Sequence, residues 1–127
     1  MEMAGTGIDE IGYVNAHGTG TPLNDVAETR CYELVFRGRS TPIPVSSTKS
    51  HIGHCLGAAG ALEAAITILA MRRSALLPTL RLADPIESQE VEYLRGAWRR
   101  QPLPAAISVS AGFGGSNAAL VFGSPDA

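Results

Sequence analysis

Residues 57–71 constrain the fold more than any other part of this chain. The segment is apolar on nearly every side, and its only polar side chains, Glu63 and Thr67, are four residues apart and lie on one stripe of a helix. This pattern predicts a buried helix, and the alanines and glycines in its first turns let another backbone approach closely. The segment contains a carboxylate and is shorter than the roughly 20 residues that cross a bilayer, so we expect no membrane span.

The remaining segments predict an α/β fold in which helices cover a mixed sheet. Strands are expected at residues 11–16 and 43–47, with a helix between them that begins at an Asn24 or Asp25 N-cap and ends at Gly38. Residues 76–82 read as an extended connection, and residues 83–104, with three prolines, as a loop-rich stretch of little regular structure. Residues 105–111 and 117–122 form two β-type runs around a glycine-rich turn, which favours an antiparallel hairpin.

Composition excludes several classes of function. At 127 residues, 45% hydrophobic and 17% charged, the chain is long and apolar enough for one globular domain and unlike a disordered segment. A net charge of −2 and few aromatic residues argue against nucleic-acid binding. Two cysteines, Cys31 and Cys55, are too few for a disulfide scaffold, and no secretory leader is evident at the start, so we expect a reduced, cytoplasmic setting.

Three unusual loops each follow the end of an expected strand. They cover residues 17–21, 48–54 and 112–115, and each contains at least one glycine. Ligands in α/β folds bind at strand ends, where glycines permit close approach. The three loops therefore predict one shared site.

Two histidines in these loops suggest electrostatic catalysis. His54 is expected at the entrance to the apolar helix, whose positive dipole end favours a neutral imidazole that can donate a hydrogen bond. With His17 it could stabilise an enolate oxygen. Each histidine taken alone could equally be an ordinary hydrogen-bonded loop residue. A metal site built from His51, His54 and Cys55 is disfavoured, because a second distant ligand pair is missing.

Lys49 is the only lysine in the chain. A carboxylate in a buried helix must find a partner or shift its pKa, so Lys49 could neutralise Glu63. That structural role is compatible with a catalytic one.

Together, three motifs resemble the C-terminal half of β-ketoacyl-[acyl-carrier-protein] synthases. They lie at residues 15–22 (NAHGTGTP), 47–60 (STKSHIGHCLGAAG) and 112–117 (GFGGSN), and the resemblance extends over about residues 8–123. The second motif resembles the elongating synthases of fatty acid synthesis more closely than the ketosynthase modules of large polyketide synthases.

The resemblance implies a thiolase-like fold and a decarboxylating Claisen condensation of an acyl thioester with a malonyl group on acyl carrier protein. By motif position His17 and His54 would stabilise the enolate, while Lys49 and Glu63 would support the site. Phe113 would contribute a backbone N–H to the acyl oxyanion hole and gate the acyl pocket with its ring. Substrate-binding positions would be Thr19, Thr21, Gly112 and Gly114. Phosphopantetheine of the carrier protein would carry the substrates, with no cofactor or metal of the protein's own.

The chain also departs from the family pattern. Where the family usually has Asn-Ser-Phe before the glycine-rich loop, this chain has Val109-Ser110-Ala111. The first aromatic residue is absent, so the resemblance does not define the shape of the acyl pocket. Neither Cys31 nor Cys55 stands at the position of the family's nucleophile, which lies in an N-terminal half. We therefore expect residues 1–127 to be a C-terminal ketosynthase segment, incomplete on its N-terminal side and inactive alone. A strand and a helix would be missing, which predicts association with itself or with the cysteine-bearing half. The alternative is a catalytically silent partner or thioester-binding subunit of a fatty acid or polyketide synthase.

Overall fold

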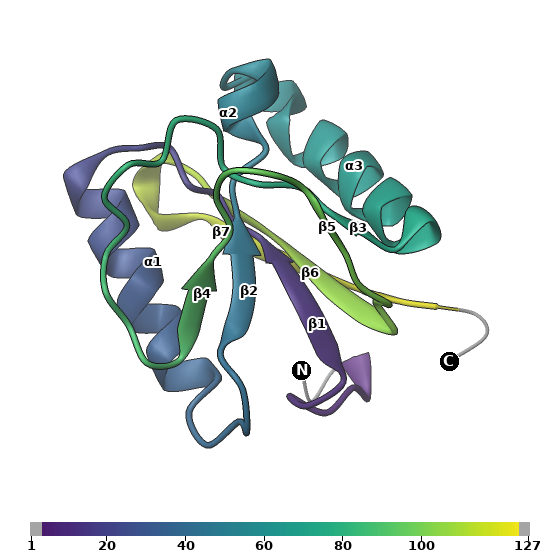
Figure 1. Ribbon diagram of the computed structural model, residues 1–127. Helices are drawn as coiled ribbons and strands as arrows, with labels where there is room; N and C mark the ends of the chain where they lie inside the picture. The colour runs from purple at the N-terminus through teal and green to yellow at the C-terminus, as the bar shows by residue number, and fades with distance from the viewer. Residues whose placement is uncertain (1–3, 125–127) are drawn as a thin grey trace.

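The computed structural model describes residues 4–124 and contains a five-stranded mixed sheet in the order β4-β2-β1-β6-β7 (Figure 1). Its central strand β1 (Ile11–Asn15) pairs in parallel with β2 (Ile43–Ser46) and β6 (Ala105–Ala111). At the edges, β4 (Val91–Tyr93) is parallel to β2, and β7 (Asn117–Gly123) is antiparallel to β6. Two short antiparallel strands, β3 (Ala75–Leu76) and β5 (Arg99–Arg100), form a separate ribbon. The predicted mixed α/β architecture and the hairpin are thus confirmed.

Helices cover both faces of the sheet. Figure 1 shows α1 (Pro22–Val35) on one side and α3 (Ala59–Arg73) on the other. A one-turn helix α2 (Lys49–Ile52) follows β2, and two 3₁₀ turns, η2 (Leu56–Ala58) and η3 (Phe113–Gly115), precede α3 and β7. Where the sequence suggested a loop over residues 48–54, the chain therefore forms a helical turn.

The core consists of two apolar clusters. One joins α1 to the sheet and contains Tyr32 and Phe36 packed with strand residues such as Val14, Val45 and Ile107. The second contains Tyr13, Leu76, Leu94, Leu103 and Ala106, with Met71 of α3 packed against it. Residues 83–104 contain little regular structure, as expected, since only β4 and β5 interrupt the loops. The stretch nevertheless contributes Leu94 and Leu103 to the core, and β4 forms an edge strand of the sheet.

Helix α1 begins earlier than predicted and buries few of its apolar side chains. It begins at Pro22 rather than after Asn24 or Asp25, because the fixed φ of proline suits a first helical position. Its buried residues are Thr29 and Tyr32, whereas Val26, Cys31 and Leu34 are exposed. Contacts with the sheet thus bury a threonine and a tyrosine of α1 and leave several of its apolar side chains exposed.

Helix α3 is buried on one stripe only. Its buried residues are Ala59, Glu63, Thr67 and Ala70, so the two polar side chains face the protein interior. Leu62, Ile68 and Leu69 are more than 40% exposed, contrary to the prediction of a helix buried all round. Within residues 4–124, no helix combines the length and apolarity that crossing a membrane requires.

The apolar face of α3 makes a prediction about association. Because contiguous exposed apolar surface marks interaction sites, we expect the purified chain to have a concentration-dependent mass above its 13.3 kDa monomer in light scattering. Replacing Leu62 and Leu69 together by Glu should shift the mass toward the monomer. Replacing the exposed residues Glu87 and Gln89 by Ala is the matched control. A monomeric wild-type chain at all concentrations would contradict this expectation.

Candidate functional site

The carboxyl ends of three parallel strands meet at one edge of the sheet and supply the site. β1 leads to His17, β2 leads through Thr48 to α2, and β6 leads to Gly112. The predicted convergence of the three loops is therefore confirmed in its main feature, because residues from each lie near the two histidines.

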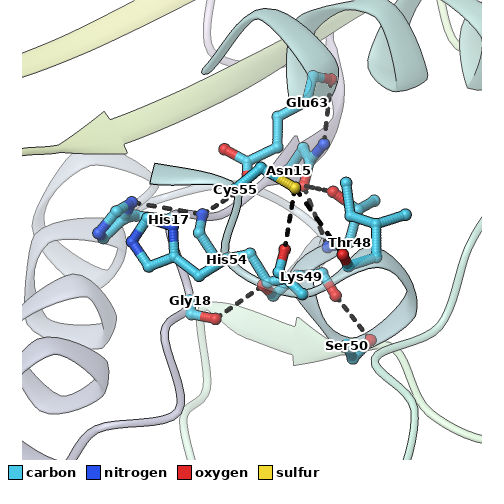
Figure 2. Close-up of polar contacts among 12 residues, drawn as sticks. Asn15, His17, Gly18, Thr48, Lys49, Ser50, His54, Cys55 and Glu63 are labelled. Carbon is cyan, nitrogen blue, oxygen red and sulfur yellow. Dashed lines mark hydrogen bonds and ion pairs between the residues drawn. The ribbon is translucent and has the colours of Figure 1, made fainter. Parts of the chain in front are cut away.

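His17 and His54 lie next to each other. Their ring centroids are 5.5 Å apart and the rings are nearly perpendicular (Figure 2). Both line a hollow of about 340 Å³, here called the histidine hollow, between the start of α3 and the β6–β7 hairpin. Apart from the histidines and Leu56, its lining residues are all Gly, Ala, Ser or Asn. His17 is buried and His54 is exposed, so the pair joins the interior to the surface.

Hydrogen bonds to Nδ1 select the same tautomer in both imidazoles. The backbone N–H of Leu56 donates to Nδ1 of His54 at 3.2 Å. Nζ of Lys49 lies 3.4 Å from Nδ1 of His17, and an ammonium can only donate. Each neutral ring therefore carries its proton on Nε2, which leaves two neighbouring Nε2–H donors for an oxyanion. His54 does not lie directly at the start of α3, because Cys55 and η2 separate it from that helix. The hydrogen bond from the Leu56 N–H, rather than the helix dipole, therefore sets the tautomer of His54.

Lys49 and Glu63 form a buried ion pair. Nζ of Lys49 contacts Oε1 of Glu63, and both side chains are at most 5% exposed. The other carboxylate oxygen of Glu63, Oε2, has no hydrogen-bond partner among the described residues. The charge of the Glu63 carboxylate is therefore offset through Oε1, by Lys49. The pairing anticipated from the sequence is confirmed.

Asn15 is a site residue that sequence reasoning missed. Its side chain is fully buried; Nδ2 donates to the Glu63 carbonyl and to Oγ1 of Thr67, while Oδ1 accepts from the backbone and hydroxyl of Thr48. It thereby joins β1, the start of α2 and α3. A buried amide at a strand end was the available signal, since such a group must be hydrogen-bonded.

Glu28 of α1 was also missed. Its carboxylate accepts the backbone N–H groups of His17 and Gly18, and on the other side it accepts from Asn24 and from the hydroxyl of Tyr32. Burial and the Glu28 carboxylate raise the pKa of Tyr32, so this phenol stays protonated and donates. Glu28 thus holds the backbone that carries His17.

The loop after His17 requires a glycine at position 18. Gly18 has a φ of +41°, and a Cβ atom built there would lie 2.5 Å from Cβ of Ser47. Oγ of Ser47 donates to the Gly18 carbonyl at 2.7 Å. The close approach of these two loops keeps His17 beside Lys49.

Several predicted site residues do not line the histidine hollow. Gly112 does, but Thr19, Thr21, Phe113 and Gly114 are not among its lining residues. Thr19 and Thr21 share a hydrogen bond between their hydroxyls, and the Phe113 side chain is fully exposed. Neither Cys31 nor Cys55 lines the hollow. Within residues 4–124, no cluster of three or more His, Cys, Asp or Glu side chains could hold a metal ion.

The ion pair makes a stability prediction. Lys49→Met should lower the free energy of unfolding by about 3 kcal/mol, because it leaves a buried carboxylate unpaired. The double variant Lys49→Met/Glu63→Gln removes both charges and should recover much of the loss. Urea unfolding of the three proteins measures this, and an unchanged midpoint for Lys49→Met would remove the pair from the account of stability.

The environment of His17 makes a pH prediction. Burial and the nearby Lys49 charge lower the pKa of His17 below its usual 6.5. Below about pH 6.5, His17 binds a proton more readily in the unfolded chain than in the folded one. The free energy of unfolding therefore falls as the pH falls. Relative to His17→Gln, the wild-type free energy of unfolding should drop between about pH 7 and 5, by at most about 1.4 kcal/mol per pH unit. Parallel pH curves for the two proteins would contradict this.

Residues 1–83 match the family described as "Beta-ketoacyl synthase, C-terminal domain". The 3-oxoacyl-[acyl-carrier-protein] synthase 2 of Coxiella burnetii is 42% identical over 118 residues, which cover 93% of this chain and 28% of that protein. The tetracenomycin polyketide synthase ketoacyl synthase alpha subunit of Streptomyces glaucescens is 39% identical over 117 residues, 92% of this chain and 28% of its own. The chain therefore spans well under a third of these relatives.

Solved structures of ketosynthases contain the same fold. The ishigamide ketosynthase/chain length factor superposes with a TM-score of 0.88 at 30% identity, over 96% of this chain and 30% of its own. A ketosynthase bound to the hexaketide, in complex with its type II polyketide acyl-carrier protein, gives a TM-score of 0.87 at 28% identity, over 94% and 29% of the two chains. The sequence match and the fold agree, and the chain belongs to the β-ketoacyl synthase family, matching its C-terminal domain.

Proposed function

We propose that this chain supplies the two-histidine half of a condensing site. The site would join an acyl thioester to a malonyl group on acyl carrier protein in fatty acid or polyketide synthesis. The observation that carries the proposal is the pair of adjacent imidazoles whose Nδ1 atoms both accept hydrogen bonds. Relatives named as 3-oxoacyl-[acyl-carrier-protein] synthases support the reaction class.

In the proposed reaction the malonyl group loses carbon dioxide. The electrons of the broken C–C bond pass into the thioester, whose carbonyl oxygen becomes an enolate oxygen. Nε2–H groups of His17 and His54 donate to that oxygen as its charge develops, and because both rings are already oriented, little reorganisation is needed. The enolate carbon then attacks the acyl carbonyl, a cysteine thiolate leaves, and the product is a 3-oxoacyl thioester.

Lys49 and Glu63 have supporting roles in this proposal. The Lys49 ammonium donates to Nδ1 of His17 and thereby keeps the catalytic proton on Nε2. Glu63 offsets the Lys49 charge and holds the ammonium in place. Lys49 also adds positive charge beside the developing enolate.

The remaining roles involve groups outside the histidine hollow. The cysteine that carries the acyl group would come from a cysteine-bearing ketosynthase half, since neither cysteine of this chain lines the hollow. The Phe113 backbone N–H would contribute to the acyl oxyanion hole, with the Phe113 ring as a gate that closes only in the assembled enzyme. Thr19, Thr21 and Gly114 would contact the phosphopantetheine arm. The substrate arm is the only prosthetic group that this chemistry needs.

The test is a chimera in which this chain replaces the matching segment of the Coxiella burnetii relative. We expect the chimera to release carbon dioxide from malonyl-carrier protein, and His17→Ala or His54→Ala to lower that rate by at least about a hundredfold, as loss of an oxyanion donor does. Acylation of the relative's cysteine should continue in both variants, as measured by mass spectrometry. His51→Ala is the matched control, because this exposed ring bonds to the Pro78 carbonyl and does not line the hollow.

Two results would contradict the proposal. If acylation fell as much as decarboxylation, the two histidines would not have the assigned role. If the folded chimera were inert while the parent relative was active, the chain would be a silent or thioester-binding subunit.

A further inference from the structure

Strand β7 forms one edge of the five-stranded sheet, and it is an unprotected edge. Its seven residues are exposed or half-buried, and within residues 4–124 its only strand partner is β6. Residues 117–123 contain no charged side chain and no proline. The opposite edge strand, β4, is only three residues long and has Glu92 at its centre. Short length and charge are devices that keep an edge strand from pairing, so β7 is the edge that remains able to pair.

The hydrogen bonds at the two ends of the β6–β7 hairpin show which backbone groups of β7 point outward. The Gly112 N–H donates to the Ser116 carbonyl at one end, and the Ser124 N–H donates to the Pro104 carbonyl at the other. Hydrogen-bonded and non-hydrogen-bonded pairs alternate along an antiparallel ladder, so the even-numbered residues of β7 bond to β6. The N–H and C=O groups that face away from β6 therefore belong to the odd-numbered residues: Asn117, Ala119, Val121 and Gly123.

These outward groups match a second copy of the same strand. In an antiparallel pairing centred on Leu120, Ala119 of one copy lies opposite Val121 of the other, and Asn117 lies opposite Gly123. Every outward N–H and C=O of β7 then has a partner. Moving the centre of the pairing to either neighbouring residue leaves the outward groups at one end of the strand unpaired.

The side chains of β7 also suit pairing with themselves. Opposite residues share a face of a sheet, so the half-exposed Leu120 would meet the Leu120 of the second copy. On the same face Phe122 would lie opposite Ala118, and on the other face Val121 would lie opposite Ala119. Large side chains thus meet small ones, and no two charges are brought together.

We propose that two copies of this chain associate through antiparallel β7–β7 pairing centred on Leu120, which joins their sheets into one. Backbone hydrogen bonds supply the affinity of such an edge-to-edge contact, and the opposed side chains set its register. The contact uses the same surface of both copies, so it closes at two copies. This edge is separate from the apolar face of α3, and the inference does not depend on the proposed reaction.

The test uses the chain carrying Leu62→Glu and Leu69→Glu, so that association through α3 is suppressed. Sedimentation equilibrium should show a reversible dimer of twice the 13.3 kDa monomer mass. Adding Leu120→Lys should raise the dissociation constant of the dimer by more than about tenfold, because like charges would meet at the centre of the pairing. Leu120→Glu should have the same effect, and an equimolar mixture of the Lys and Glu proteins should restore the dimer. Leu34→Lys is the matched control, since it places the same charge at another exposed leucine, on α1.

Ala119→Pro is a second variant that carries the test if circular dichroism shows that the charged variants unfold. It removes an outward N–H and no bond to β6, a position at which an edge strand tolerates proline, and it should weaken the dimer. A monomer at every concentration before residue 120 is changed would overturn the proposal and leave the edge to a strand of a different protein. A dimer that persists in Leu120→Lys and Ala119→Pro would also overturn it. A mixture of the Lys and Glu proteins that stays monomeric would overturn the pairing centred on Leu120.

Discussion

The buried ion pair between Lys49 and Glu63 is the interaction on which the rest of the site depends. Two charges taken out of water are tolerated only when they are paired, so α3 must pack where Glu63 reaches the first turn of α2. His54 lies in the short link between these helices, and fixing both ends of the link places it beside His17. Asn15 strengthens the same junction by bonding to both sides of it.

The sheet provides the second constraint, because three parallel strands end at one edge. Helix α1 then leads back across one face, where Glu28 holds the His17–Gly18 backbone with two N–H···O bonds. Each imidazole is held by a different element: Lys49 orients His17, and the Leu56 backbone orients His54. Such preformed donors suit a reaction in which negative charge develops on one oxygen.

Much of this arrangement was predictable from local sequence. Glycine-containing loops after strand-like segments predicted that residues of three loops meet at one end of the sheet, and the Glu63–Thr67 spacing predicted a polar stripe that needs a partner. Three features were not predicted. The start of α1 was misplaced although Pro22 is a local signal for a first helical position. The burial of Thr29 and Tyr32 in α1 depends on contacts with the sheet, and β4 is a three-residue strand, too short to show a periodicity.

The sequence by itself determined the chemical groups: two histidines in glycine-rich loops, one lysine, and one carboxylate in an apolar helix. These follow from residue type and spacing, which are local properties. Only the tertiary structure decided that Asn15 and Glu28 hold those groups, that α3 leaves an apolar face uncovered, and that β7 forms an edge of the sheet. Such features depend on contacts between residues far apart in the chain, and local patterns carry no information about which distant surfaces meet.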